Sequence, residues 1–424
     1  MKLSIKNIGK IKEANVEING ITVIAGENNT GKSTIGKSLY AIFCSFYDIE
    51  EKIEIERKNS VRRLVSRIPI MIDTDFLDYE IPDDYVGKVS DDILLCRERI
   101  LSNEIDIKDI FVDSLECGVE EGIEIDDDFI SELAIRLKEV LSVTKEDLLK
   151  LVLEKRLIQE FYGQVSNIFT ENEGSIILGI KNDDISVSIK NNTITNISNK
   201  KNISLHTEAI YIDDPFILDD ISAVFFNRKY RRGFDHRTAL KYKLKSRENS
   251  NTLVDEIIAK DKLQGIYDKI NTVCSGEVME DGNIGLIYRR KNTDKDLNVE
   301  NLSTGLKTFV ILKMLLEKGI IERNGTFILD EPEIHLHPEW QLLFAEIIVL
   351  IQKEFGVHIL LNTHSPYFLN AIEVYSVKYG INSKCKYYLA RTENDLSVIE
   401  DVTNNIEKIY QKLARPLQVL ENEV

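Results

Sequence analysis

One octapeptide constrains this chain more than any other feature, and it reads Gly26-Glu27-Asn28-Asn29-Thr30-Gly31-Lys32-Ser33. Its spacing is G-x-x-x-x-G-K-S, and it lies between a strand-like run at residues 20–25 and a helix-like run that begins at residue 32. The glycines let successive backbone N–H groups turn toward one phosphate, and the N-terminus of the following helix adds partial positive charge. Because strand, loop and helix occur in the order that a phosphate-binding loop requires, the sequence predicts a nucleotide site.

Two residues of this loop have expected chemical roles. Lys32 is expected to reach the β- and γ-phosphates, and Ser33 to bind Mg²⁺. The predicted ligands are therefore ATP and Mg²⁺. The predicted nucleotide contacts are Gly26, Asn28, Asn29, Thr30, Gly31, Lys32, Ser33 and Thr34.

A second motif follows near residue 330. The apolar run Thr326-Phe327-Ile328-Leu329 ends in Asp330-Glu331, which is the pattern of a buried strand that ends in two carboxylates. Asp330 suits a Mg²⁺ ligand acting through the water shell of the ion, and Glu331 suits the base that polarises the attacking water. An apolar strand ending in acids is common by itself, but beside a phosphate-binding loop it predicts a catalytic strand.

Two further segments complete the expected site. Ser303 and Gly305, in Leu302-Ser303-Thr304-Gly305, precede an apolar helix, so Ser303 is either a plain N-cap or part of a signature loop that contacts the γ-phosphate of ATP bound by another subunit. His364 ends the apolar strand 357–364 and is either a γ-phosphate sensor or a structural histidine. His335 and His337 have H-x-H spacing but no further Cys or His nearby at ligand spacing, so a zinc site is disfavoured.

Composition limits the classes of function. The chain has 424 residues, 43% hydrophobic and 29% charged content, and five scattered cysteines. These values fit a cytoplasmic globular protein with reduced thiols, and the absence of a long apolar run argues against a membrane span. The net charge of −17 would repel nucleic acid on average. A basic run that includes Arg228, Arg231 and Arg232 leaves a local DNA patch open beside the alternative of a solvated helix face.

The hydrophobic pattern divides the chain into five segments. Residues 1–46 are expected to form the N-terminal part of an ATPase head, and residues 253–380 its C-terminal part. Residues 47–172 read as a helical insertion, because apolar residues recur at helical spacing without sustained heptads. Residues 173–252 read as a β-rich and basic connecting segment, and residues 381–424 as a C-terminal tail.

The order of the motifs GENNTGKS, LSTG, FILDEPEIHLHP and LLNTHSPYFL resembles that of the ABC/SMC-like ATPases of the OLD type. The resemblance covers residues 1–46 and 296–377, and it implies an α/β P-loop ATPase head with an inserted helical subdomain. It also implies that ATP is held between the phosphate-binding loop of one protomer and the signature loop of another, as in a dimer or a multiple of dimers. The roles it implies are catalysis for Lys32, Glu331 and His364, metal binding for Ser33 and Asp330, and contact in trans for Ser303 and Gly305.

The chain also departs from that family. No glutamine occurs between Thr34 and Gln159, so the Q-loop contact to Mg²⁺ has no candidate. OLD nucleases continue into a Toprim domain, whereas only 60 residues follow His364, without an acidic metal cluster of that kind. The chain more closely resembles stand-alone ATPase subunits of anti-phage systems such as Septu or PARIS. This resemblance implies a regulatory ATPase that controls a separate effector, such as a nuclease, and the alternative is a DNA-processing ATPase like RecF or SMC.

Overall fold

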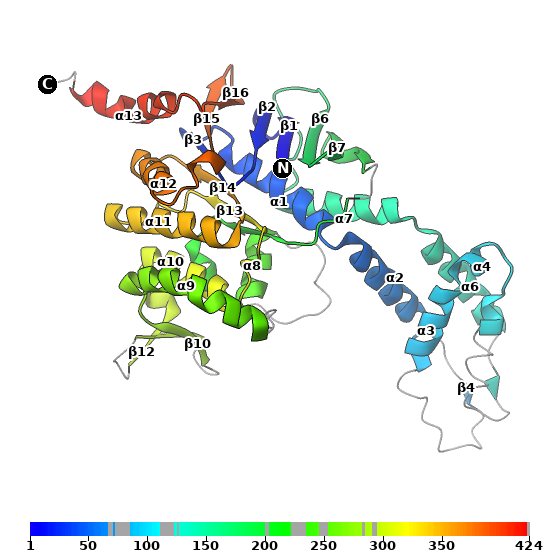
Figure 1. The fold of residues 1–424 in the computed structure, drawn as a ribbon. Coiled ribbons are helices and arrows are strands. Elements are labelled where there is room, and N and C mark those ends of the chain that lie inside the picture. Colours follow the sequence, from blue (N-terminus) through cyan, green and yellow to red (C-terminus); the bar gives the residue numbers. More distant parts are fainter. Residues whose placement is uncertain are drawn as a thin grey trace. The chain divides into compact units, whose positions relative to one another are not determined.

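The computed structural model describes residues 1–66, 71–72, 85–110, 123–124, 127–199, 203–221, 235–245, 253–281, 285–290 and 295–421. The chain divides into two compact units, whose elements are labelled in Figure 1. Residues 1–47 and 152–424 form the first, here called the head unit, and residues 48–151 form the second, here called the inserted unit.

A large mixed sheet organises the head unit. Eleven of the described strands form it, in the order β8-β7-β6-β1-β2-β16-β15-β3-β14-β13-β9. The strands are β1 Lys2–Ile8, β2 Ile11–Glu17, β3 Ile21–Gly26, β6 Gly174–Ile180, β7 Asp183–Lys190, β8 Thr193–Ser198, β9 Ala209–Ile212, β13 Thr326–Asp330, β14 His358–Thr363, β15 Cys385–Glu393 and β16 Leu396–Asp401. The α/β class expected from the sequence is thereby confirmed.

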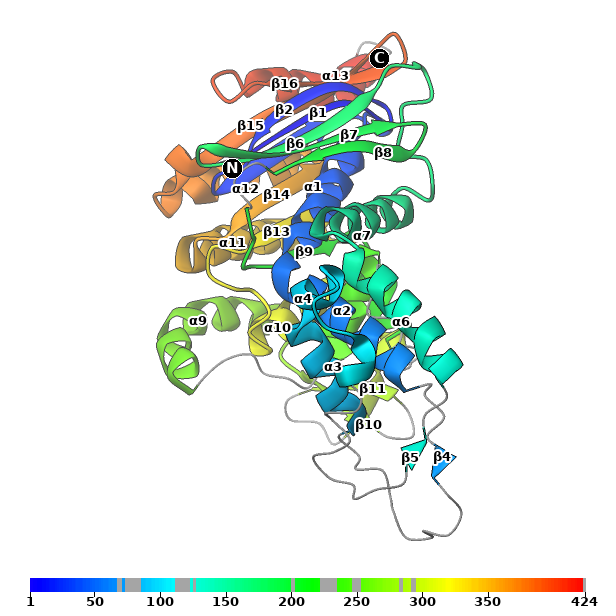
Figure 2. The same cartoon turned by 90° about the vertical axis from the view of Figure 1, so that its right-hand side faces the viewer.

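Burial explains why one part of this sheet is parallel and the other antiparallel. The run β9-β13-β14-β3-β15 is joined by parallel pairs, and every residue of β3, β9 and β13 is buried. Continuous apolar strands of this kind suit a parallel sheet covered on both faces. The run β8-β7-β6-β1-β2 is joined by antiparallel pairs (Figure 2), and β16 pairs antiparallel with β15 but parallel with β2. Burial alternates along most of β1 and along β7.

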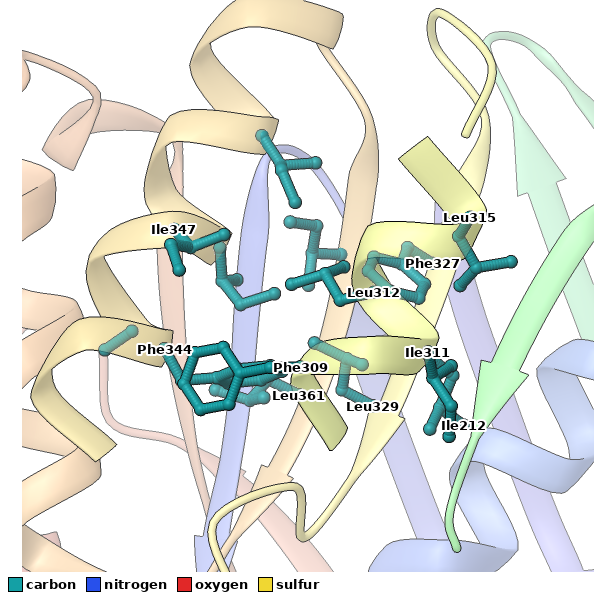
Figure 3. Packing of buried hydrophobic residues seen from close by; sticks show 14 of the residues in the cluster. Ile212, Phe309, Ile311, Leu312, Leu315, Phe327, Leu329, Phe344, Ile347 and Leu361 are labelled. Atoms are coloured by element: carbon teal, nitrogen blue, oxygen red, sulfur yellow. The ribbon is translucent and has the colours of Figure 1, made fainter. Parts of the chain in front are cut away.

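Helices pack on the parallel strands and build the main core. The described helices of the head unit are α1 Lys32–Phe46, α8 His236–Lys245, α9 Leu253–Val273, α10 Thr304–Glu317, α11 Pro338–Phe355, α12 Pro366–Lys378 and α13 Glu407–Glu421, with short 3-10 turns η1 Pro215–Leu218, η3 Val299–Asn301 and η4 Asn382–Lys384. Figure 3 shows Phe309 of α10 and Phe344 of α11 next to each other, with Leu361 and Leu329 beside Phe309. The two phenyl rings cross at 87° with centroids 5.5 Å apart, an edge-to-face contact that favours this packing. A small sheet of β10 Glu277–Asp281, β11 Gly285–Arg289 and β12 Asp296–Asn298 precedes the signature segment.

The inserted unit has its own helical core. Its described elements are α2 Ile49–Val65, α3 Tyr85–Leu95, α4 Arg97–Leu101, α6 Asp127–Ser142 and a short pair of strands, β4 Met71–Ile72 and β5 Ile123–Glu124. Val61, Val89, Ile93 and Leu137 are among its fully buried side chains. Helix α7 (Lys145–Glu160) begins in this unit and ends in the head unit. Thr144 caps it, because its hydroxyl accepts a hydrogen bond from the Asp147 amide at 3.0 Å.

The C-terminal segment contributes to the sheet and to the surroundings of the phosphate-binding loop. β15 pairs with β3, and β16 pairs with β15 and β2. On α13, the Nζ of Lys412 lies 3.0 Å from the Glu27 carboxylate of the loop. Among the helices described by the structure, we find none that combines the length and apolar character needed to cross a bilayer.

Candidate nucleotide-binding and catalytic site

The phosphate-binding loop connects β3 directly to α1. Gly31 precedes the first residue of α1 and has φ of 80°, a left-handed conformation that glycine adopts without strain. A Cβ atom at this position would lie 2.5 Å from Cδ1 of Ile11, so any side chain there would also have to displace Ile11. Residues 27–29 are exposed, whereas Thr30 and Lys32 are buried. The loop therefore offers its backbone to solvent while its lysine is directed inward.

Lys32 is held by the loop and by the catalytic strand. Its ammonium donates to the carbonyl oxygens of Gly26 at 3.1 Å and Glu27 at 2.9 Å. The same Nζ lies 3.1 Å from Oε1 of Glu331, and only 4% of the lysine side chain is exposed. A buried ammonium needs such partners, because removal from water would otherwise be costly. The motifs at residues 26–33 and 330–331 therefore meet at the C-terminal ends of the parallel strands β3 and β13.

Asp330 and Glu331 are adjacent in sequence, but their different backbone conformations place the two carboxylates in different surroundings. Asp330 ends β13, whereas Glu331 has φ of 51°, a left-handed conformation that is uncommon for a residue with a side chain. The Glu331 amide donates to the Asn362 carbonyl at 2.9 Å, which holds the turn against β14. Local strain of this kind often occurs at functional sites. The turn places the Glu331 carboxylate next to Lys32, whereas Asp330 remains the last residue of β13.

Asp330 has both carboxylate oxygens engaged by buried neighbours. Its Oδ2 accepts from the Tyr211 hydroxyl at 3.0 Å, and its Oδ1 accepts from Nδ2 of Asn362 at 2.9 Å. These contacts fix the plane of the carboxylate and leave lone pairs for a further ligand. Neither Tyr211 nor Asn362 was singled out from the sequence. Both lie near the C-terminal ends of β9 and β14, the strands on either side of β13, and this position is the signal from which they could have been predicted.

His364 follows β14 and lies beside two carboxylates. Its Nδ1 is 3.4 Å from Oε2 of Glu331 and 3.8 Å from Oε1 of Glu333. The Glu331 carboxylate raises the pKa of His364, and His364, with Lys32, lowers the pKa of Glu331. Glu331 is therefore ionised near neutral pH, as a proton acceptor must be.

Glu333 is a further residue of the candidate site, and the sequence analysis did not single it out. It is almost fully buried, accepts from the Thr363 hydroxyl, and accepts from the His364 amide at 3.2 Å. Burial raises the pKa of Glu333. Its contacts fix the backbone at the end of β14 and hence the start of the loop that carries His364. It is two residues beyond Glu331, where sequence alone suggests only a loop.

Ser303 and Gly305 lie at a different place, at the N-terminus of α10. Ser303 is the N-cap residue, but its side chain makes no capping hydrogen bond. The two residues line a hollow of about 280 Å³ with Thr304, His335, His337 and Trp340, and none of Lys32, Glu331 or His364 lines it. A Cβ on Gly305 would come within 2.8 Å of the His335 carbonyl oxygen. Within one chain, the structure thus brings together every catalytic candidate except the signature residues.

The H-x-H segment has structural contacts. His337 is the N-cap of α11, and its Nδ1 accepts from the Glu339 amide at 3.4 Å. The His335 ring packs edge-on against Phe216 with centroids 5.8 Å apart.

The basic run is only partly described. Arg228, Arg231 and Arg232 lie outside the described residues. Farther along, Arg237 pairs with Asp213 at 2.8 Å, Lys241 with Asp220 at 2.8 Å and Lys243 with Glu208 at 2.5 Å. These three cations are therefore neutralised within the chain.

With this geometry established, comparison with known proteins identifies the family. A family model described as "AAA domain, putative AbiEii toxin, Type IV TA system" matches residues 21–370. The chain belongs to this AAA-domain family. The match includes the phosphate-binding loop, the strand that ends in Asp330, and His364.

Individual relatives are more distant. A probable ATPase of retron Vc95 from Vibrio cholerae serotype O1 biovar El Tor is 28% identical over 94 residues, which are 20% of this chain and 18% of that protein. The SMC head domain from Thermotoga maritima aligns with a TM-score of 0.36 and 12% identity, over 95% of this chain and 98% of that one. An Smc head with an extended coiled coil, bound to the C-terminal domain of ScpA derived from Pyrococcus furiosus, gives a TM-score of 0.40 and 11% identity over 99% and 98%.

The site also fits the ligands expected of such a protein. The Ser33 hydroxyl and the Asp330 carboxylate are hard oxygen donors of the kind that Mg²⁺ prefers. Next to Asp330, the buried Oδ1 of Asn362 has no hydrogen-bond partner among the described residues. An unpartnered buried oxygen at this place suits ordered water around a hydrated cation. The backbone loop and Lys32 suit a nucleotide triphosphate.

Proposed function

We propose that this protein hydrolyses ATP with Mg²⁺ and that two copies hold each nucleotide between them. The observation that carries the proposal is the meeting of Lys32, Glu331 and His364 at the ends of neighbouring strands. Each motif alone has an ordinary structural explanation, but a phosphate-binding lysine, a carboxylate base and a histidine within ion-pair distance are the parts that γ-phosphate hydrolysis requires.

In the proposed reaction, the loop amides hold the β-phosphate and Lys32 moves from Glu331 to the β- and γ-phosphates. Glu331 then loses one of the two cations that lower its pKa, so it becomes a stronger proton acceptor once the substrate is in place. Glu331 accepts a proton from the water as the water oxygen bonds to the γ-phosphorus, and the bond from the γ-phosphorus to the β–γ bridging oxygen breaks, so that ADP and phosphate leave. His364 stays beside Glu331. Ser33 and Asp330 would hold Mg²⁺, which when bound neutralises charge on the phosphates.

The signature residues Ser303 and Gly305 are the reason for proposing that two copies associate. Ser303 is an N-cap whose hydroxyl is unused by its own helix, and it lines a hollow that the chain's own catalytic residues do not enter. A helix N-terminus with free donors suits an anionic γ-phosphate. We infer that Ser303 and Gly305 contact the ATP of a second copy, as the resemblance to ABC/SMC-like heads implies.

We further propose a regulatory role in a bacterial anti-phage complex, in the cytoplasm, where ATP-linked association controls a separate effector such as a nuclease. This part rests on the resemblance to stand-alone ATPase subunits of the Septu and PARIS type. The alternative, a DNA-binding ATPase like RecF or SMC, is weakened because Arg237, Lys241 and Lys243 are paired with acids.

The test uses purified full-length protein. We expect Mg²⁺-dependent ATP turnover, and an increase in molar mass by light scattering when ATP is added to the Glu331→Gln variant, which should retain the nucleotide. The Lys32→Ala variant should show neither effect. An absence of ATP binding would overturn the enzyme proposal, and nuclease activity of the purified single chain would overturn the regulatory one.

A further inference from the structure

A buried ion cluster lies at the end of β9, the strand that pairs with β13. His236, the first residue of α8, has its Nδ1 2.7 Å from Oε2 of Glu160 and its Nε2 3.0 Å from Oδ2 of Asp213. The His236 amide also donates to Oε1 of Glu160 at 2.8 Å. The exposed side-chain fractions are 6% for His236, 0% for Glu160 and 15% for Asp213. The cluster therefore joins the end of α7, the end of β9 and the start of α8 inside the head unit.

The charges of this cluster are balanced. Burial alone would lower the pKa of His236, but Asp213 and Glu160 outweigh it and raise that pKa to about 9. Burial likewise opposes ionisation of Asp213, but His236 and Arg237 lower its pKa to about 2. Arg237 lies 2.8 Å from the same carboxylate. At neutral pH the centre of the cluster is an imidazolium between two carboxylates, which is the pairing that a buried charge requires.

Tyr211 connects this cluster to Asp330. Its ring stacks on the His236 ring with centroids 4.2 Å apart and an angle of 19° between planes. Its hydroxyl donates to Oδ2 of Asp330 at 3.0 Å, in a fully buried position. A planar cation stacked on a phenol ring restricts both rings. The direction of the hydroxyl is therefore set by a residue that does not contact the metal ligand.

The neighbouring helix leaves room for this arrangement. A Cβ on Gly36 of α1 would lie 3.0 Å from the Tyr211 hydroxyl oxygen and 3.2 Å from Cγ2 of Ile328. Glycine inside a helix costs about 1 kcal/mol relative to alanine. The space above α1 is thus occupied by the phenol that reaches Asp330, and a larger residue at Gly36 would displace it.

We propose that His236 is a positioning residue for the Mg²⁺ site, because the imidazolium held between Glu160 and Asp213 fixes the ring of Tyr211, which in turn orients the carboxylate of Asp330. The inference rests on the proposed function, since it presumes that Asp330 serves a bound cation. Removing a residue that hydrogen-bonds to a metal ligand commonly weakens metal binding by about 10-fold to 100-fold.

The first test measures metal binding without turnover. Mn²⁺, a spectroscopic probe for the Mg²⁺ site, is titrated by electron paramagnetic resonance into the full chain saturated with a non-hydrolysable ATP analogue. Tyr211→Phe keeps the ring and removes the hydroxyl, and it should weaken Mn²⁺ binding about 10-fold. Binding of the analogue in EDTA should be unchanged. Tyr410→Phe is the matched control, because it removes a 2.9 Å hydrogen bond to Glu373 between α13 and α12, and it should leave Mn²⁺ affinity unchanged.

The second test asks whether His236 acts through Tyr211. His236→Gln should weaken Mn²⁺ binding roughly threefold or more, and the double variant no more than Tyr211→Phe alone, because both changes affect one hydroxyl. Nitrogen-15 spectra of the wild-type protein should show the His236 ring doubly protonated at pH 7.5. Unchanged Mn²⁺ affinity in Tyr211→Phe, multiplicative losses in the double variant, or a neutral His236 ring would each overturn the inference.

These outcomes are distinct from failure of the proposed function. If the wild-type protein with the analogue binds no Mn²⁺, the metal site and the inference that rests on it fall together. If it binds Mn²⁺ and Asp330→Asn abolishes that binding while Tyr211→Phe does not, only the role of His236 and Tyr211 is wrong.

Discussion

The ammonium of Lys32 lies 3.1 Å from the carboxylate of Glu331, so the residue that would bind the phosphates and the residue that would activate water form an ion pair with each other. In the proposed reaction, ATP separates them before hydrolysis begins. The ion pair therefore links substrate binding to the basicity of Glu331, and the first prediction follows from it.

Glu331→Gln should lower ATP turnover by about 10²-fold to 10⁴-fold, because it removes the general base. ATP affinity should be equal or higher, since Lys32 no longer has a carboxylate to leave. Single-turnover kinetics and titration with a fluorescent nucleotide measure the two quantities separately. Glu393→Gln is the matched control, because Glu393 pairs with Arg391 at the surface of β15. Turnover near the wild-type rate in Glu331→Gln would indicate a nucleotide-binding scaffold instead of an active ATPase.

Gly31→Ala should abolish ATP binding and lower Tm. A left-handed conformation costs an L-residue about 1–2 kcal/mol, and the new Cβ would meet Ile11 at 2.5 Å. Gly163 provides the control, because it has φ of 84° with nothing within 4 Å of its Cβ direction. Gly163→Ala should therefore show the conformational cost alone, with ATP binding intact. Thermal melts and calorimetric titration measure both effects, and equal behaviour of the two variants would contradict the structure of the loop.

Stability should depend on pH through the His236 cluster. The pKa of His236 is raised from 6.5 to about 9, so its contribution is complete below pH 6.5 and is lost as pH rises through 9. The pKa of Asp213 is lowered from 3.8 to about 2, so its contribution is complete above pH 3.8 and is lost as pH falls through 2. Both residues therefore make their full contribution to stability between pH 3.8 and pH 6.5. The two contributions describe one ion pair, so they are not added.

The measurement is the difference in the free energy of unfolding between wild-type protein and His236→Gln. Near pH 6 the charge of His236 contributes on the order of 3 kcal/mol to this difference. The difference should shrink at pH 9.5, where the wild-type ring has lost its proton. Urea unfolding at the two pH values provides both numbers, and a difference that stays constant or grows would contradict the assignment of a buried imidazolium.

DNA binding offers a test of the alternative function. Since Arg237, Lys241 and Lys243 are paired with acids and the net charge is −17, we expect weak duplex binding that does not change in an Arg231→Ala, Arg232→Ala variant. Fluorescence anisotropy at 50 and 200 mM salt, concentrations over which phosphate contacts lose affinity steeply, is the measurement. Tight, salt-sensitive binding that this variant loses would support the DNA-processing alternative.

The sequence was most informative where a motif requires one backbone geometry. The glycine and lysine spacing of residues 26–33 predicts the loop between β3 and α1, and the apolar run before Asp330 predicts a buried strand, both of which the structure contains. The alternating runs at residues 3–8 and 14–18 pair as β1 and β2, as their period of two indicates.

The supporting residues could not be found in the same way. Tyr211, Glu333 and Asn362 are ordinary strand or loop residues in the sequence, and their roles arise only when β9, β13 and β14 lie side by side. The ion cluster is less local still, because Glu160, Asp213 and His236 come from three elements whose pairing no short-range pattern specifies. Local periodicity predicts the elements, whereas tertiary packing decides which polar side chains meet.

The central claim is that one chain supplies Lys32 and Glu331 while another supplies Ser303, and mixing two inactive variants tests it most directly. Lys32→Ala removes the phosphate contact, Ser303→Arg blocks the signature loop, and each variant alone should lack ATP turnover. A mixed dimer contains one intact pairing of Lys32 with Ser303, so we predict that mixing restores a substantial part of wild-type turnover. Full activity of Ser303→Arg alone, or no recovery on mixing folded variants that still associate, would contradict a site shared between two copies.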